Sequence, residues 1–432
     1  MRIAFIVQRY GAEILGGAEY ACRLTAERLA ARHEVEVLTT CARDYVTWKN
    51  EYPEGSDRIR GVTVRRFANA QARDIAAFNR YSDWIFNNPH DAADEMEWLK
   101  QQGPWSPALV DYLKRTHKNY DALIFYTYLY APTVLGIQID PARSILVPTA
   151  HDEPPIHLGI YTDVFRLPRG IGYLTQVERK FVTDTFERSA AIEEIVGCGV
   201  EVPPHHAYPR PAGQDPEETA GQNESGQPDP TPEADEGASP SRFQSHVSTR
   251  GATFRRRHRV HGPFVLYGGR IDPGKGCEEL IEYFSSYVEE GGDAALVLMG
   301  LKLMPLPEES FINFAGLLSE QERLHALEAA TVVVVPSPYE SLSLLALEAL
   351  AVGTPILCNA RSDVLVDHCL RSNGGLFYAD RDEFVECLKL LVADGRLRAA
   401  MGRAGREYVR RNYRWDVVLG KIDRMISRIK QG

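Results

Sequence analysis

The chain has 432 residues, 44% of them hydrophobic and 25% charged, which is ordinary for a soluble globular protein of two or three domains. Its formal net charge is −10, but eight acidic and no basic side chains lie between residues 212 and 241, so the rest of the chain carries only −2. This nearly neutral remainder gives no support for nucleic-acid binding.

The first half alternates strand and helix patterns. Residues 3–7 are a buried-strand pattern directly after Met1, so no leader peptide is expected. An amphipathic helix is predicted at 18–32, and Thr175 and Glu178 have the spacing of a helix-capping box. Further strands are predicted at 34–40, 61–67, 120–127, 144–149 and 172–175, and residues 193–203 close this half.

Two further features bear on location. No segment approaches about 18 uninterrupted apolar residues, so no membrane-spanning helix is predicted. The seven cysteines are scattered and form no C-x-x-C pair, which is typical of reduced cysteines in a cytosolic protein. We therefore expect a cytoplasmic protein that is at most peripheral to a membrane.

Residues 205–262 separate the two halves. From 209 to 241 the sequence is rich in Pro, Gly, Glu, Asp and Gln and has almost nothing to bury, so it predicts a disordered linker. The basic run RRRHR at 255–259 is interpreted as a solvated linker end, with a membrane-surface or phosphate contact as the alternative.

The second half repeats the alternation. Strands are predicted at 264–269, 294–300, 331–335, 355–359 and 375–378, and helices from 277, at 319–330 and at 343–352. Alternation in both halves predicts an α/β protein with two Rossmann-like, doubly wound domains that face each other across a cleft. We assign 1–204 to the first domain, 263–414 to the second, and 415–432 to a C-terminal helix that packs back on the first.

Two carboxylates, Glu340 and Glu348, lie in the apolar stretch PSPYESLSLLALEALAVGTP at 336–355. Glu340 follows the buried strand 331–335, and Glu348 lies little more than a turn inside the next helix. Ligands of parallel sheets bind beyond the carboxyl ends of the strands. Both carboxylates are therefore expected either to face a polar ligand or to be exposed.

The strand at 264–269 leads through RIDPGKG into a helix. Arg270 and Lys275 then lie near a helix N-terminus, which carries free N–H groups and a partial positive charge. Two added cations suit a diphosphate. A plain turn with two surface cations is the alternative.

The first half has two loops of interest. Gly16 and Gly17 precede the first helix, but they form neither G-x-G-x-x-G nor a Walker loop. His151 follows the strand 144–149 together with two carboxylates, and these side chains suit hydrogen bonding to hydroxyls. The alternative for Gly16 and Gly17 is a flexible loop at a helix start. The alternative for the His151 loop is a capped loop with exposed charges. The aromatic segment 74–105 is interpreted as a helical hairpin with a buried face, with stacking on sugar or lipid as the alternative.

No metal site is predicted. The sequence DRD at 380–382 has the form of a metal–nucleotide motif, but it lies at a strand-to-helix junction, where Asp380 and Glu383 predict a helix cap. No cluster of His and Cys suggests a metal either.

Taken together, GGRIDPGKG and PSPYESLSLLALEALAVGTP resemble the retaining GT-B glycosyltransferases of family four, whose signature is an E-x7-E pair preceded by Arg and Lys after the first strand of the second domain. GGAE at 16–19 and AGLLSEQE at 315–322 match further segments of that family. The resemblance covers nearly the whole chain except the linker. The chain departs from the family in having Ser341, Leu342 and Ser343 where Gly-Phe-Gly is frequent.

The resemblance implies a role for each site residue. Glu340 would contact the transferred sugar or support its developing positive charge, and Glu348 would bind the ribose. Arg270 and Lys275, with the helix N-terminus at Ser343, Leu344 and Leu345, would neutralise the departing diphosphate. His151 would contact the sugar from the first domain, and the loop at Gly16 and Gly17 would close on the ligand.

The implied function is transfer of a sugar, with retention, from a nucleotide-diphosphate sugar to a hydroxyl of a glycan or lipid-linked acceptor, without a cofactor, in cell-envelope or exopolysaccharide synthesis. The alternatives are a non-catalytic nucleotide-sugar binder and an epimerase or phosphorylase of the same fold. An NAD-dependent oxidoreductase would require a G-x-G-x-x-G motif, which the sequence lacks.

Overall fold

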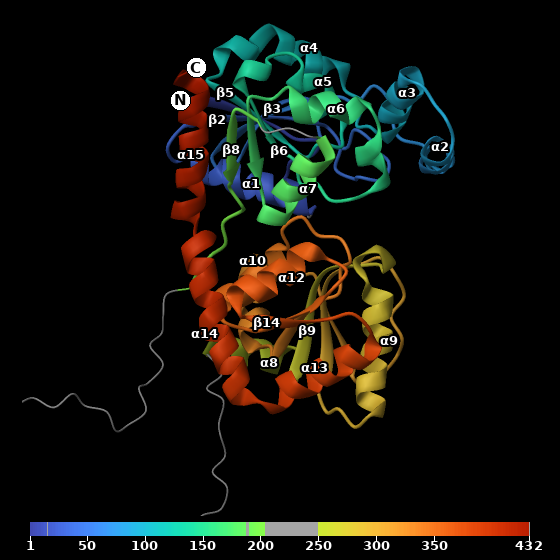
Figure 1. The fold of residues 1–432 in the computed structure, drawn as a ribbon, viewed down its shortest axis with the longest axis vertical. Helices are drawn as coiled ribbons and strands as arrows, with labels where there is room; N and C mark the ends of the chain where they lie inside the picture. Colours follow the sequence, from blue (N-terminus) through green and yellow to red (C-terminus); the bar gives the residue numbers. More distant parts are fainter. Residues whose placement is uncertain (15, 187–189, 204–248, 432) are drawn as a thin grey trace, which may run out of the picture.

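The structure, a computed structural model, describes residues 1–14, 16–186, 190–203 and 249–431. The chain forms two α/β domains, which lie one above the other in Figure 1. The predicted architecture of two doubly wound domains is thus confirmed.

The first domain is built on an eight-stranded sheet, which is parallel except at its edge strand β3. The strand order is β3-β4-β2-β1-β5-β6-β7-β8. The strands are β1 (Arg2–Ile6), β2 (Glu34–Thr40), β3 (Gly55–Ile59), β4 (Val62–Phe67), β5 (Ala122–Tyr126), β6 (Ser144–Val147), β7 (Gly170–Tyr173) and β8 (Ile192–Ile195). Strand β3 was not predicted from the sequence, because its side chains are mostly exposed and polar and it is held by pairing with β4 rather than by burial.

Helices cover both faces of this sheet, because alternate residues of each strand point to opposite sides. Ile3 and Phe5 of β1 pack toward the first and last helices of the chain, whereas Ala4 and Ile6 pack toward the helices in the middle of the domain. The helices are α1 (Gly17–Leu29), α2 (Ile75–Asn87), α3 (Ala92–Gln102), α4 (Pro107–Thr116), α5 (Ala131–Ile137), α6 (Ile160–Arg166) and α7 (Gln176–Phe186). The predicted helical hairpin at 74–105 is confirmed as α2 and α3, which pack against each other and project from one side of the first domain (Figure 1).

The second domain has a six-stranded, fully parallel sheet in the order β11-β10-β9-β12-β13-β14. The strands are β9 (Phe264–Ile271), β10 (Ala295–Lys302), β11 (Ile312–Gly316), β12 (Val332–Val335), β13 (Ile356–Asn359) and β14 (Gly375–Tyr378). The helices are α8 (Thr249–Arg257), α9 (Cys277–Glu289), α10 (Glu320–Ala329), α11 (Leu344–Val352), α12 (Asp363–Ser372), α13 (Arg381–Ala393) and α14 (Gly395–Asn412). The predicted caps at Ser319 and Asp380 are confirmed, because their side chains accept the N–H groups of Glu322 and Glu383.

The second domain begins earlier than predicted. Residues 249–257 form α8, which packs against α10 and buries Phe254, and Val260 beyond it is also buried. The assignment of 249–262 to the segment between the domains, with 255–259 as a solvated linker end, was therefore wrong, because Phe254 and Val260 anchor this stretch to the second domain. The remainder of the predicted linker, residues 205–248, lies outside the described residues.

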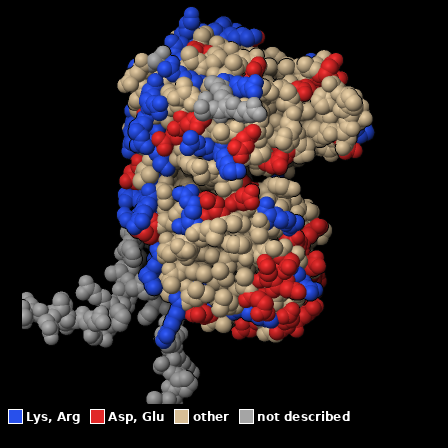
Figure 2. Space-filling view, viewed as in Figure 1, with Lys and Arg blue, Asp and Glu red and all other residues tan. Residues whose placement is uncertain are grey.

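The last helix, α15 (Trp415–Gln431), returns to the first domain. It packs against β8 and α1, with Ile422, Met425 and Ile426 in the same hydrophobic cluster as β1 (Figure 1). Among the described residues, no helix combines the length and the apolar character needed to cross a membrane. The molecular surface is indented between the two domains (Figure 2), and the carboxyl ends of the strands in both sheets lead toward this region.

Candidate active site

The loop after β9 is fixed against the loop after β12 by a close backbone approach. Asp272 caps the short helix η4 (Pro273–Lys275) by accepting the N–H of Lys275 at 3.0 Å. Gly276 follows with φ +74°, and a Cβ at this position would lie 2.4 Å from the carbonyl oxygen of Pro336. Only glycine fits both the left-handed backbone and this contact.

This packing brings Lys275 and Glu340 together. The Lys275 ammonium lies 2.8 Å from Oε1 of Glu340 and 3.3 Å from the Ser337 hydroxyl. Both charged side chains retain partial exposure, 29% for Lys275 and 18% for Glu340. The pair is therefore open to a polar ligand at the carboxyl ends of β9 and β12.

Arg270 lies at the end of β9 and faces the first domain. Its Nε is 3.3 Å from Asp272, and its Nη1 donates to the hydroxyl of Tyr45 at 3.2 Å. The guanidinium also lies over the Tyr45 ring, 5.5 Å from the centroid. Tyr45 thus reaches a predicted phosphate-binding cation from the opposite domain. Tyr45 was not predicted as a site residue, because its sequence neighbourhood carries no signal for this contact.

The N-terminus of α11 is formed by a residue with unusual backbone geometry. Ser343 has φ +61°, and its hydroxyl accepts the N–H of Ala346 at 3.4 Å. Leu344 and Leu345 form the first helical turn, whose N–H groups point out of the helix end. Buried His368 fixes the preceding loop, because its Nε2 donates to the carbonyl of Leu342 at 2.7 Å. Burial lowers the pKa of His368, so the ring is neutral in this role.

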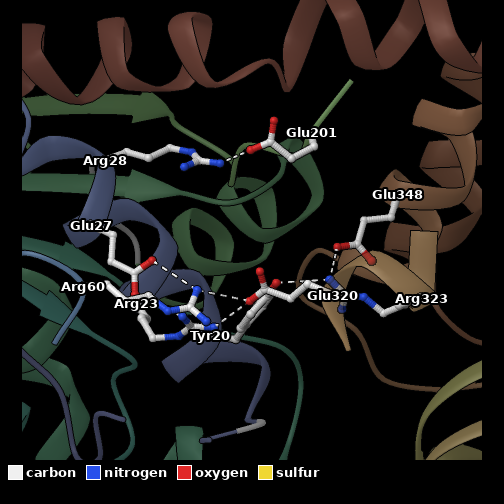
Figure 3. Close-up of polar contacts among 9 residues, drawn as sticks. All are labelled: Tyr20, Arg23, Glu27, Arg28, Arg60, Glu201, Glu320, Arg323 and Glu348. Atoms are coloured by element: carbon white, nitrogen blue, oxygen red, sulfur yellow. Dashed lines mark hydrogen bonds and ion pairs between the residues drawn. The ribbon is translucent and has the colours of Figure 1, made fainter. Parts of the chain in front are cut away.

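Glu348 lies inside α11 with 7% of its surface exposed. Its Oε1 accepts from Arg323 at 2.7 Å (Figure 3). Burial raises the pKa of Glu348, and the positive charge of Arg323 opposes this shift. In the sequence Arg323 looks like an ordinary helix-surface charge, and no local pattern distinguishes it.

His151 enters from the loop after β6. Its ring stacks near that of Tyr339, with centroids 6.0 Å apart, and its Nε2 lies 3.6 Å from Glu153. The Nδ1 atom is buried and has no hydrogen-bond partner among the described residues. Because Tyr339 directly precedes Glu340, His151 of the first domain lies close to the Lys275–Glu340 pair of the second.

The His151 loop is held from beneath by Glu178 of α7. Its carboxylate accepts the N–H of Ala150 at 2.6 Å and also that of Leu174. The predicted cap is present in part, since the Thr175 hydroxyl accepts the N–H of Glu178 at 3.1 Å. The Glu178 side chain serves the His151 loop as well, which spacing alone does not reveal.

The glycine loop before α1 is braced by a buried ion pair. Gly16 is the N-cap of α1, and a Cβ there would lie 2.0 Å from Oε2 of Glu19. Glu19 in turn accepts from the buried Arg9 at 2.7 Å. At Gly17 a Cβ would meet no atom within 4 Å, so this residue borders open space.

The structure thus gathers most of the predicted site residues in two groups. Arg270, Lys275, Glu340 and His151 lie around the loops that follow β6, β9 and β12, and Glu348 lies deeper in α11 with Arg323. Two cations near a helix N-terminus can hold a diphosphate, and the carboxylates can accept hydrogen bonds from hydroxyl groups. Gly16 and Gly17 begin α1, the helix that carries Tyr20 to Arg323.

The second domain of the chain matches a known protein family. Residues 252–408 match the family model for glycosyl transferases group 1. A GDP-mannose-dependent monoacylated alpha-(1-6)-phosphatidylinositol monomannoside mannosyltransferase of Corynebacterium glutamicum is 27% identical over 181 residues, which are 38% of this chain and 47% of the relative. The trehalose synthase of Rubrobacter xylanophilus is 28% identical over 36% of this chain and 41% of its own. The matched part spans less than half of each relative.

Solved structures match over nearly the whole chain. Sucrose-phosphate synthase from Thermosynechococcus elongatus superposes with a TM-score of 0.66 at 17% identity, covering 99% of this chain and 98% of its own. Anabaena Alr3699/HepE, solved in complex with UDP-glucose, gives 0.65 at 15% identity and covers 100% of both chains. The chain therefore has the GT-B fold, and its second domain matches the glycosyl transferases group 1 family.

Proposed function

We propose that this protein transfers a sugar from a nucleotide-diphosphate sugar to a hydroxyl of a glycan or lipid-linked acceptor, with retention of anomeric configuration. The observation that carries the proposal is the Lys275–Glu340 pair, 2.8 Å apart at the carboxyl ends of β9 and β12, with His151 facing it from the first domain. The family match and the names of the relatives, which include mannosyltransferases, support a sugar-transfer role.

In this proposal the second domain holds the donor by charge. Lys275 and Arg270 neutralise the diphosphate, together with the N–H groups at the start of α11. Glu348 accepts a hydrogen bond from a ribose hydroxyl. Glu340 lies beside Lys275, so it supports positive charge on the sugar while Lys275 balances negative charge on the phosphate. His151 has a partly exposed side chain and a buried Nδ1 without a partner among the described residues, which suit a contact with a sugar hydroxyl.

The reaction breaks the bond between the anomeric carbon and the β-phosphate oxygen and forms a bond from that carbon to the acceptor oxygen. The acceptor proton passes to an oxygen of the leaving diphosphate on the same face of the sugar. This route requires no second carboxylate at the spacing found in glycosidases. Residues that stabilise the departing charge thereby perform most of the catalysis. We place the reaction in cell-envelope or exopolysaccharide synthesis, near the cytoplasmic face of the membrane.

The test begins with donor binding by the full chain. UDP-glucose and GDP-mannose, with other nucleotide sugars, are screened for a rise in melting temperature, because a ligand that binds the folded state stabilises it. The best donor is then incubated with glycan and lipid-linked acceptors, and NMR gives the anomeric configuration of the product. Transfer with retention, lost in Glu340→Gln but kept in the surface control Glu386→Gln, is the expected result. Binding without transfer to any acceptor, or an inverted product, would contradict the proposal.

A further inference from the structure

Arg323 of α10 contacts Glu348 of α11 and Tyr20 of α1 at the same time (Figure 3). Its Nη2 lies 2.7 Å from Glu348 Oε1 and 3.1 Å from the Tyr20 hydroxyl oxygen. The guanidinium also lies over the Tyr20 ring, 5.4 Å from its centroid. Because Tyr20 belongs to the first domain, one side chain links the buried carboxylate of the second domain to the helix that follows the glycine loop.

The second oxygen of Glu348 is left without a donor. Oε2 is buried and has no hydrogen-bond partner among the described residues, although Oε1 is bound by Arg323. Leaving a buried acceptor unpaired is costly, and the cost is greater for a charged group. A carboxyl group with one oxygen fixed and the other unpaired is suited to accept a hydrogen bond from a ligand hydroxyl.

The contact between α10 and the first domain has a second point one turn earlier. Glu320 accepts from Arg23 at 3.2 Å and from Arg60 at 3.4 Å, and Arg23 is itself paired with Glu27 at 3.0 Å (Figure 3). Residues three apart lie on the same side of a helix. The face of α10 that carries Glu320 and Arg323 therefore packs against α1. This contact holds the Arg323 guanidinium in place.

We propose that Arg323 is a positioning residue of the nucleotide site: it fixes Oε1 of Glu348 so that Oε2 is presented to a ribose hydroxyl, and Tyr20 holds Arg323 in that orientation from the first domain. This inference rests on the proposed function, because it takes the ligand of Glu348 to be a ribose. It adds that ribose recognition depends on how α1 of the first domain meets α10.

The experiment measures discrimination between ribose and deoxyribose. Isothermal titration calorimetry is performed on the full chain with UDP, GDP and ADP, and then with the 2′-deoxy and 3′-deoxy forms of the nucleotide that binds best. The wild type should prefer the ribonucleotide by about tenfold or more, as expected for a hydrogen bond to a charged group. Arg323→Met should lose this preference, because the substitution should weaken binding of the ribonucleotide but not of the deoxy forms. Arg323→Lys should retain part of it, and Tyr20→Phe should reduce it. Arg398→Met, which removes a half-buried arginine far from the site, is the matched control.

Each outcome is decisive. A folded Arg323→Met protein that keeps the wild-type ratio of ribonucleotide to deoxynucleotide affinity would overturn the inference. An equal loss of affinity for both nucleotides would also overturn it, because such a loss indicates a structural role. If Arg323→Met does not fold, unchanged discrimination in both Arg323→Lys and Tyr20→Phe overturns it instead. A wild type that binds nucleotides but does not distinguish ribose from deoxyribose refutes the role of Glu348 and the inference with it, and leaves nucleotide binding standing. A wild type that binds no nucleoside diphosphate refutes the proposed function.

Discussion

The ammonium group of Lys275 lies 2.8 Å from a carboxylate oxygen of Glu340, although the two residues belong to different loops of the second sheet. The contact depends on Gly276, which allows the η4 loop to lie against Pro336. The pair is only partly buried, so Lys275 can interact with a diphosphate while it remains beside Glu340. In this arrangement a positive and a negative side chain meet at the carboxyl ends of β9 and β12, where the proposed reaction would separate charge.

Lys275→Ala is expected to reduce turnover more than it raises the Michaelis constant for the donor. The charge on the leaving group grows toward the transition state, so its stabilisation appears mainly in turnover. Loss of one such donor costs on the order of a hundredfold in rate or more. Steady-state kinetics with the cognate donor measures the effect. Lys389→Ala, which removes an exposed cation of α13, is the control, and wild-type turnover in Lys275→Ala would favour a plain surface turn.

Tyr45→Phe is expected to act through Arg270. The substitution removes the hydroxyl that accepts from Arg270 but keeps the ring on which the guanidinium rests. Turnover should fall less than in Arg270→Ala, and the double variant should lose less than the product of the two effects, because both act on one group. Kinetics of the three variants gives this coupling. Strictly multiplicative losses would show that Tyr45 and Arg270 act independently.

Much of the fold was predictable because most strands are short buried runs. The edge strands β3 and β11 were not predicted, because they are largely exposed or half-buried. The loops with Arg270, Lys275 and Glu340 were also predictable, since cations and carboxylates at the ends of strands carry chemistry in a local pattern. Tyr45 and Arg323 were not, because their roles arise from contacts between domains, across 225 residues for the pair Tyr45–Arg270 and 303 for Tyr20–Arg323. Nothing in the sequence near either residue encodes such a contact.

The stretch at 249–262 shows the opposite failure. Its arginines dominate the composition and led to a linker assignment, but Phe254 and Val260 fix it to the second domain. Arg255 is also held, since its guanidinium donates to the carbonyl of Ala329 at 2.7 Å. A few buried side chains decide whether a polar segment is ordered, and average composition does not register them.

Ser343→Gly is expected to stabilise the protein, although it removes a helix cap. Ser343 has φ +61°, a conformation that costs a non-glycine residue about 1–2 kcal/mol. Replacing a serine cap by glycine loses only a few tenths of a kcal/mol, whereas replacement by alanine costs about 1 kcal/mol. Ser343→Ala should therefore be destabilised, because it keeps the strained backbone without the cap. Chemical denaturation of both variants measures the difference, and equal stabilities would show that the backbone of Ser343 relaxes.

The last prediction concerns the pH dependence of stability through Glu178. Burial raises the pKa of Glu178 to about 8 against the opposing effect of the backbone N–H groups that it accepts. Between the ordinary glutamate pKa of 4.5 and about 8, the folded state retains a proton that the unfolded state has lost, so the contribution of Glu178 to stability falls as the pH rises. The change over this window is about 5 kcal/mol, at about 1.4 kcal/mol per pH unit. Glutamine is neutral like the protonated acid, but its single accepting oxygen can replace only one of the two that bind Ala150 and Leu174. Glu178→Gln should therefore lose a pH-independent amount of stability, and its stability relative to the wild type should rise from pH 5 to pH 8. Urea denaturation across this range compares the two, with Glu386→Gln as a surface control. A stability difference that does not vary with pH would show that Glu178 is ionised throughout and that its bonds to Ala150 and Leu174 outweigh its burial.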